Sequence, residues 1–159
     1  MHEEKVTPGP GYLIEEKGVF NLKKVFSEIK DWLKEYNYKF NETKRKHKKG
    51  DFGDIIEITW TADRVVAEYI KFSITINFVL EDIIPSGERL VSGKAQILIG
   101  AKATIDYQKQ WEPTKLRKFF MGLYQKLFLQ DTIDKYVDKL DTEIKDLRGT
   151  IKEVFDFYR

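Results

Sequence analysis

The spacing of apolar residues changes twice along this 159-residue chain, and that change limits the folds open to it. Across residues 22–36 the apolar positions recur every three or four residues, which is the period of an amphipathic helix, and Asn21 is a good capping residue. Across residues 37–110 the period falls to two, as in strands with one buried face. The helical period returns after Pro113. This order predicts an α+β fold.

The alternating segments predict an antiparallel sheet. Residues 56–60 and 70–80 place large apolar side chains on one side and mainly polar ones on the other. Residues 89–109, as one strand, would extend roughly 70 Å at about 3.3 Å per residue. A domain of this size is narrower than that, so we expect a bend at Gly93 or Gly100.

The chain predicts one domain over residues 12–159, preceded by a flexible, extended or turning arm at residues 1–11. Residues 12–20 suggest a short strand with poor alternation. Two helices are expected near the C-terminus, at about 116–128 and 132–157. The predicted fold is a curved antiparallel β-sheet packed against an N-terminal helix and long C-terminal helices.

Composition excludes several kinds of chemistry. The chain has no cysteine, which excludes disulfides, thiolate metal sites and cysteine nucleophiles. Its two histidines, His2 and His47, have no neighbouring ligand residues in the sequence, so we expect no metal and no cofactor. There is no glycine-rich phosphate loop, no paired-carboxylate motif and no nucleophile elbow. These absences favour a protein that is not an enzyme.

Glu68 is the one weak catalytic candidate. It shares strand parity with Ile70 and Phe72, which would point it inward among apolar groups, where a carboxyl group can serve as a general acid or base. A bulge near Ala67, or a position at the open end of the strand, would instead return Glu68 to water.

Location is predicted from missing signals. The first residues contain no apolar stretch like that of a signal peptide, and no run of 18 apolar residues could form a transmembrane segment. A soluble cytoplasmic protein is expected. Of the 28 basic residues 22 are lysine, and this lysine and glutamate bias is common in heat-adapted proteins.

The most prominent local feature is a basic run. Residues 39–49 contain six basic residues and one acid. We expect a solvated hairpin end whose lysines discourage edge-to-edge pairing. The alternative is a flexible hairpin tip that contacts a polyanion weakly. The candidate contacts are Lys44, Arg45, Lys46, Lys48 and Lys49.

The last predicted helix carries apolar residues spaced alternately by four and three. Val137, Ile144 and Ile151 fit the a positions of a two-stranded coiled coil, in which Glu143 and Arg148 would pair across a homodimer. The interpretation that we favour is that this stripe packs on the protein's own sheet.

The order of a helix over 22–36, alternating segments and a closing helix over 132–157 resembles the START-like helix-grip superfamily. The resemblance covers roughly residues 12–157, rests on element order, and carries no residue motif. It implies an apolar cavity between sheet and helix that holds a lipid-like or polycyclic ligand.

Two function hypotheses follow. The leading one is a non-catalytic binding domain that holds an apolar small molecule between the curved sheet and the last helix. The alternative is an interaction or assembly protein that self-associates through residues 132–157 and contacts an acidic partner through residues 44–49. The predicted ligand-binding residues are Phe72, Ile74, Ile76, Ile97, Ile99, Ala101, Ala103, Leu140, Ile144 and Leu147.

Overall fold

The computed structural model describes residues 2–5, 11–68, 70–105 and 130–157. It confirms the α+β prediction of a curved antiparallel sheet with an N-terminal and a C-terminal helix. One long C-terminal helix lies in the described part, and the helix predicted at 116–128 falls outside it. The described elements, in chain order, are β1 (His2–Lys5), β2 (Tyr12–Phe20), α1 (Leu22–Glu35), β3 (Lys39–Gly50), β4 (Gly53–Ala67), β5 (Ile70–Pro85), β6 (Val91–Ile105) and α3 (Gln130–Asp156).

The sheet has six strands in the order β1-β6-β5-β4-β3, with β2 also paired to β6. Every pairing is antiparallel. β1 pairs with residues 102–105 of β6, and β2 pairs with residues 91–99, so both strands share one edge. Four residues of the predicted arm therefore belong to the sheet. The opposite edge is formed by β3.

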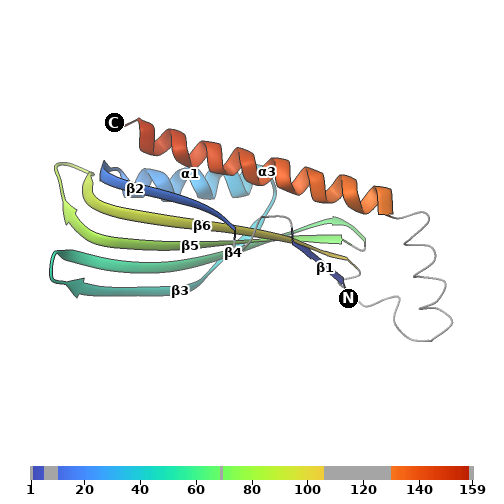
Figure 1. Ribbon diagram of the computed structural model, residues 1–159, viewed down its shortest axis with the longest axis horizontal. Coiled ribbons are helices and arrows are strands. Elements are labelled where there is room, and N and C mark those ends of the chain that lie inside the picture. The colour runs from blue at the N-terminus through green and yellow to red at the C-terminus, as the bar shows by residue number, and fades with distance from the viewer. Residues whose placement is uncertain (1, 6–10, 69, 106–129, 158–159) are drawn as a thin grey trace.

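Both helices cover the same face of the sheet (Figure 1). The predicted cap of α1 is confirmed: the backbone N–H of Lys24 donates to Oδ1 of Asn21 at 3.1 Å. α1 ends at Glu35 with Tyr36 as its C-cap, and Asn37 then adopts a left-handed conformation with φ of 63°. That turn directs the chain into β3.

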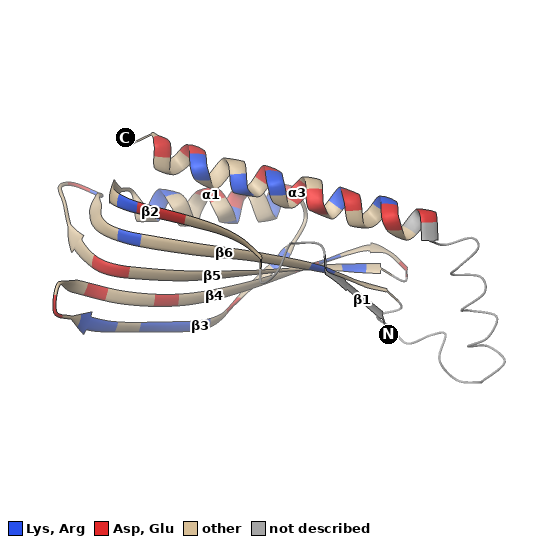
Figure 2. Ribbon diagram, viewed as in Figure 1, with Lys and Arg blue, Asp and Glu red and all other residues tan. Residues whose placement is uncertain are grey.

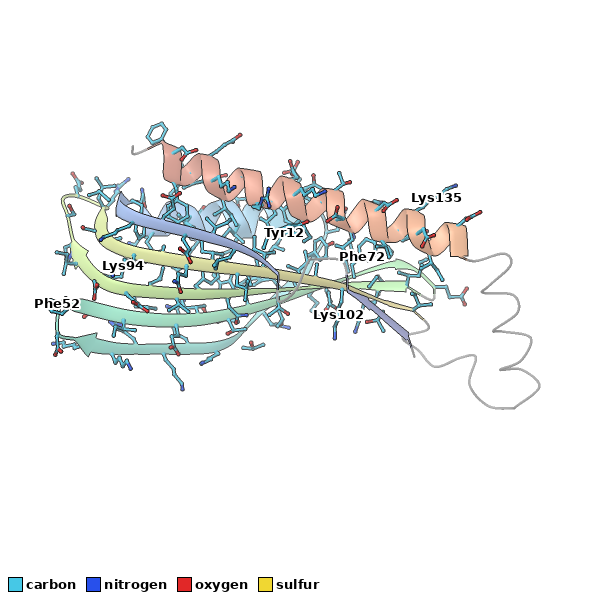
Figure 3. The ribbon with its side chains drawn as sticks, in the orientation of Figure 1. Tyr12, Phe52, Phe72, Lys94, Lys102 and Lys135 are labelled. Carbon is cyan, nitrogen blue, oxygen red and sulfur yellow. The ribbon has the colours of Figure 1, made fainter. Side chains whose placement is uncertain are left out.

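The core lies between the helices and the inward face of the strands. Alternate residues of β5 from Ile70 to Leu80 are at most 1% exposed, as the period of two predicts. In Figure 3, Phe72 lies between the sheet and α3, whereas Phe52 lies at the end of the sheet, away from the helices.

One end of the sheet is tightly packed around Gly93. A β-carbon at this position would lie 2.7 Å from the carbonyl oxygen of Glu81 and 2.9 Å from that of Asp82. The β5–β6 register shifts between Glu81 and Ile84, and Asp82 has a φ of 55°. β6 runs through Gly93 and Gly100 as one strand, and the sheet curves along its length (Figure 1).

Candidate functional site

The basic run lies on an edge strand of the described sheet, with no further described strand beside it. β3 is the last strand in the sheet order, and every residue from Asn41 to Lys49 is exposed. Figure 2 shows the run as a band of basic residues along this strand. We call Lys44, Arg45, Lys46, His47, Lys48 and Lys49 the cationic edge.

The expected hairpin tip is corrected by this placement. The run stays in register with β4 from Lys44, opposite Thr59, to Gly50, opposite Gly53. Only Asp51 and Phe52 are left for the turn between the two strands. The run is a strand because its backbone pairs with β4, although its side chains bury almost nothing.

The side chains of the cationic edge divide between the two faces of the sheet. The register shifts between Glu42 and Lys44, where a bulge reverses the alternation. Beyond it, Lys46 and Lys48 lie opposite Glu57 and Ile55, whereas their neighbours on β3 lie opposite residues of the helix-covered side. Cross-strand partners point to the same face. Lys46 and Lys48 therefore project from the face that the helices leave uncovered.

Three of the six residues of the cationic edge have acidic partners. The unpartnered members are Lys46, Lys48 and Lys49, which form no ion pair with the described residues. All three are exposed, so their positive charge faces solvent. The ion pairs are Lys44 with Glu57 at 3.3 Å and Arg45 with Glu42 at 2.8 Å, and Nε2 of His47 lies 3.0 Å from a carboxylate oxygen of Asp54.

Glu42 anchors the start of the cationic edge. Its carboxylate accepts two hydrogen bonds from Arg45, at 2.8 and 3.1 Å, and one from Nε1 of Trp60 at 3.0 Å. The hydrogen bonds from Arg45, and then the one from Trp60, lower the pKa of Glu42. The hydrogen bond to Glu42 raises the pKa of Arg45. Arg45 is thus already paired with an acid of its own chain, whereas the three unpartnered lysines are not.

A depression of about 430 Å³ lies beside the unpartnered lysines. It is lined by Lys46, His47, Lys48, Ile55 and Glu57. Two amines, the imidazole of His47 and the carboxylate of Glu57 lie at its border together with one apolar side chain. Glu57 is already paired with Lys44, so the charges left for a partner are those of Lys46 and Lys48, which suit a partner that carries negative charge and a small apolar group.

Glu68 does not face the core. It is exposed in the turn after β4, and the β4–β5 register shifts between Val65 and Ala67. The bulge at this position changes the parity that pointed Glu68 inward. The alternative that returned its carboxylate to water is therefore the correct one.

The ten predicted ligand-binding residues do lie together between the sheet and α3. All are buried, at 0–1% exposure except Ala101 at 7%. Such low exposure leaves little accessible space against nine of them, because an open cavity would count as accessible surface. Their packing gives no support to an apolar ligand at this place, and that hypothesis stays a prediction.

The heptad stripe of α3 packs against other parts of the same chain. Leu140, Ile144, Leu147 and Ile151 are 0% exposed and belong to the core. α3 packs against α1, β6 and β2. In this arrangement, the seam predicted for a coiled coil is not open to a second copy.

Glu143, predicted to pair across a dimer, instead joins α3 to its own sheet. Its carboxylate accepts from Nη2 of Arg64 at 2.8 and 3.1 Å and from the hydroxyl of Tyr38 at 2.9 Å. A further Arg64 nitrogen, Nη1, donates to the carbonyl oxygen of Tyr36 at 2.7 Å. Arg148 lies 4.8 Å from the ring centre of Tyr12 in the same chain. Both residues predicted to pair across a dimer thus contact other residues of their own chain.

Sequence reasoning missed this buried network, although a signal existed. Arg64 has the parity of Ile58, Trp60 and Ala62, so it is a charged residue at an inward position of an alternating strand. A buried guanidinium requires an acidic partner. Burial, together with Glu143, raises the pKa of Tyr38 far above its ordinary value.

Other kinds of site find no support in the described ranges. Among these residues, no group of three or more metal-ligating side chains comes together. No described helix has the length and apolar character needed to cross a membrane. Comparisons with protein-family models, curated proteins and solved structures found no match. The resemblance to the helix-grip superfamily therefore stays a prediction.

Proposed function

We propose that this chain is a non-catalytic interaction domain that binds an acidic partner through the cationic edge. The observation that carries the proposal is the presence on one strand of three lysines, Lys46, Lys48 and Lys49, that are exposed and have no ion pair among the described residues. A protein with a near-neutral total charge of +2 concentrates these cations on one strand.

The local geometry supports binding rather than catalysis. The cationic edge holds side chains at strand spacing, with i and i+2 roughly 6–7 Å apart on one face. Arg45 and His47 are already held by Glu42 and Asp54, so binding leaves these two in place. The three lysines are the side chains available for an incoming anion.

Retention on a heparin column at low salt tests the charge requirement. The variant Lys46→Gln, Lys48→Gln, Lys49→Gln should elute at markedly lower salt than the wild-type protein, because each phosphate or sulfate contact adds to the salt dependence. A matched control places the same charge change on α3: Lys135→Gln, Lys139→Gln, Lys152→Gln. These lysines are exposed, and glutamine keeps the helix propensity of lysine.

The control should elute close to the wild-type protein. Equal losses in both variants would mean that only net charge matters, and unchanged retention of the β3 variant would mean that the lysines are merely solvated. Either result overturns the proposal. Far-ultraviolet circular dichroism checks that both variants keep the fold.

A further inference from the structure

The free edge of β3 carries backbone groups as well as charge. A strand inside a sheet bonds to neighbours on both sides, whereas β3 pairs only with β4 among the described strands. About half of the N–H and C=O groups of an edge strand point away from its single neighbour. Such a row of donors and acceptors is a template for another extended chain.

The edge is regular where it is most basic. From Lys44 to Gly50 every residue of β3 has a successive partner on β4, with no bulge and no proline. The one register shift lies before this stretch, between Glu42 and Lys44. Bulges and prolines are common protections of a free edge, and residues 44–50 carry neither, only charge.

Charge decides which chain can use this edge. A second copy pairing through β3 would bring two cationic edges together, and like charges opposite each other destabilise a sheet. A neutral strand would leave Lys46, Lys48 and Lys49 uncompensated. An acidic strand would place carboxylates directly opposite these lysines, where cross-strand β-carbons are about 4.5–5.5 Å apart.

We propose that β3 accepts an extended acidic protein segment as an added strand along residues 44–50. This inference rests on the proposed function and adds the partner's conformation to it. The backbone of the segment pairs with the free edge of β3, and its alternate acidic side chains lie beside Lys46 and Lys48 on the uncovered face. The neighbouring depression receives a side chain of the segment between Ile55 and Glu57.

Backbone methylation of the partner tests strand addition separately from charge. The probe is a blocked peptide of about nine alternating glutamate and threonine residues, long enough to span the edge. Two further peptides carry N-methyl groups on one or the other set of alternate residues. In an added strand only one set of N–H groups faces β3, so the three peptides differ in hydrogen bonding but not in charge.

The parent peptide should bind at low salt, and one N-methylated form should lose about tenfold or more in affinity while the other keeps most of it. Hydrogen exchange of the wild-type protein should slow at the amides of residues 44–50 when the parent peptide is added. Both readouts use unaltered protein, so a folding defect cannot imitate the result.

Several outcomes overturn strand addition. Equal affinity of all three peptides, with loss of binding in the β3 glutamine variant, would leave the proposed function standing on charge alone. Binding of an oligothymidylate or of phosphatidylserine vesicles without binding of the peptide would replace the acidic segment by nucleic acid or lipid. No binding of the peptide, of heparin or of the other two probes would remove the proposed function as well.

Discussion

Nη2 of Arg64 lies 2.8 and 3.1 Å from the two carboxylate oxygens of Glu143, and this contact ties β4 to the middle of α3. The two side chains are only 13% and 7% exposed. Arg64 also stacks at 4.7 Å on Tyr38 and at 5.4 Å on Phe72. A charged pair is thus embedded in an otherwise apolar layer.

Breaking this pair from one side should be costly. Arg64→Met or Glu143→Leu leaves a charge buried without its partner, and each should lower the free energy of unfolding by about 3–5 kcal/mol. The double variant should lose less than the sum of the two, because neither charge remains. Urea unfolding of the wild-type protein, the two single variants and the double variant measures the coupling between Arg64 and Glu143. Additive losses would show that the two groups are independent.

Tyr38 should make stability sensitive to alkaline pH. Burial and Glu143 raise its pKa in the folded protein above the unfolded value of about 10. A raised folded pKa adds stability that is complete below about pH 10 and is lost as the pH rises through the folded value.

The variant Tyr38→Phe should therefore show a shallower fall in the urea midpoint above pH 10. Tyr12 and Tyr36 also have raised pKa values, so part of the slope should persist in this variant. An identical slope in both proteins would contradict the assignment to Tyr38.

Asp141 should make stability sensitive to acidic pH. A hydrogen bond from Lys145, and then one from Tyr12, lower its pKa against the opposing effect of burial. A lowered folded pKa adds stability that is present above the unfolded value of about 4 and is lost as the pH falls through the folded value. Asp141→Asn should flatten the change in urea midpoint across this window. A steeper fall of the urea midpoint at acidic pH in the variant would contradict the expected direction.

Two glycine substitutions should have opposite effects. An alanine at Gly149 in α3 meets nothing within 4 Å, so it should stabilise the protein by about 0.5–1 kcal/mol through helix propensity. At Gly93 the new β-carbon meets the backbone of Glu81 and Asp82 below 3 Å, and the cost should be about 1–3 kcal/mol. In thermal unfolding, the midpoint should rise for Gly149→Ala and fall for Gly93→Ala.

Residue spacing predicted those parts of the fold that bury one face. The helix beginning after Asn21 and the inward residues of β5 follow their apolar periods closely. The basic run is predicted as a hairpin tip, whereas it forms an edge strand in which every residue from Asn41 to Lys49 is exposed. An edge strand held mainly by backbone pairing leaves no such pattern to read.

The buried network shows a second limit of predicting structure from residue spacing. Arg64 has inward parity, yet its partner Glu143 lies 79 residues away on a helix whose docking angle no local pattern specifies. The cationic edge was recognisable from composition, whereas its free backbone edge depends on the order of strands in the sheet. Long-range pairing is decided by packing, and residue spacing alone does not encode it.

The exposure of the cationic edge has a consequence for its motion. With every residue from Asn41 to Lys49 exposed, this part of β3 adds almost no apolar burial, so its opening should require much less free energy than global unfolding. Local unfolding would separate it from β4 while the core under α3 stays intact. A bound segment would pair with β3 on its second side. It would therefore also reduce the local unfolding that separates β3 from β4.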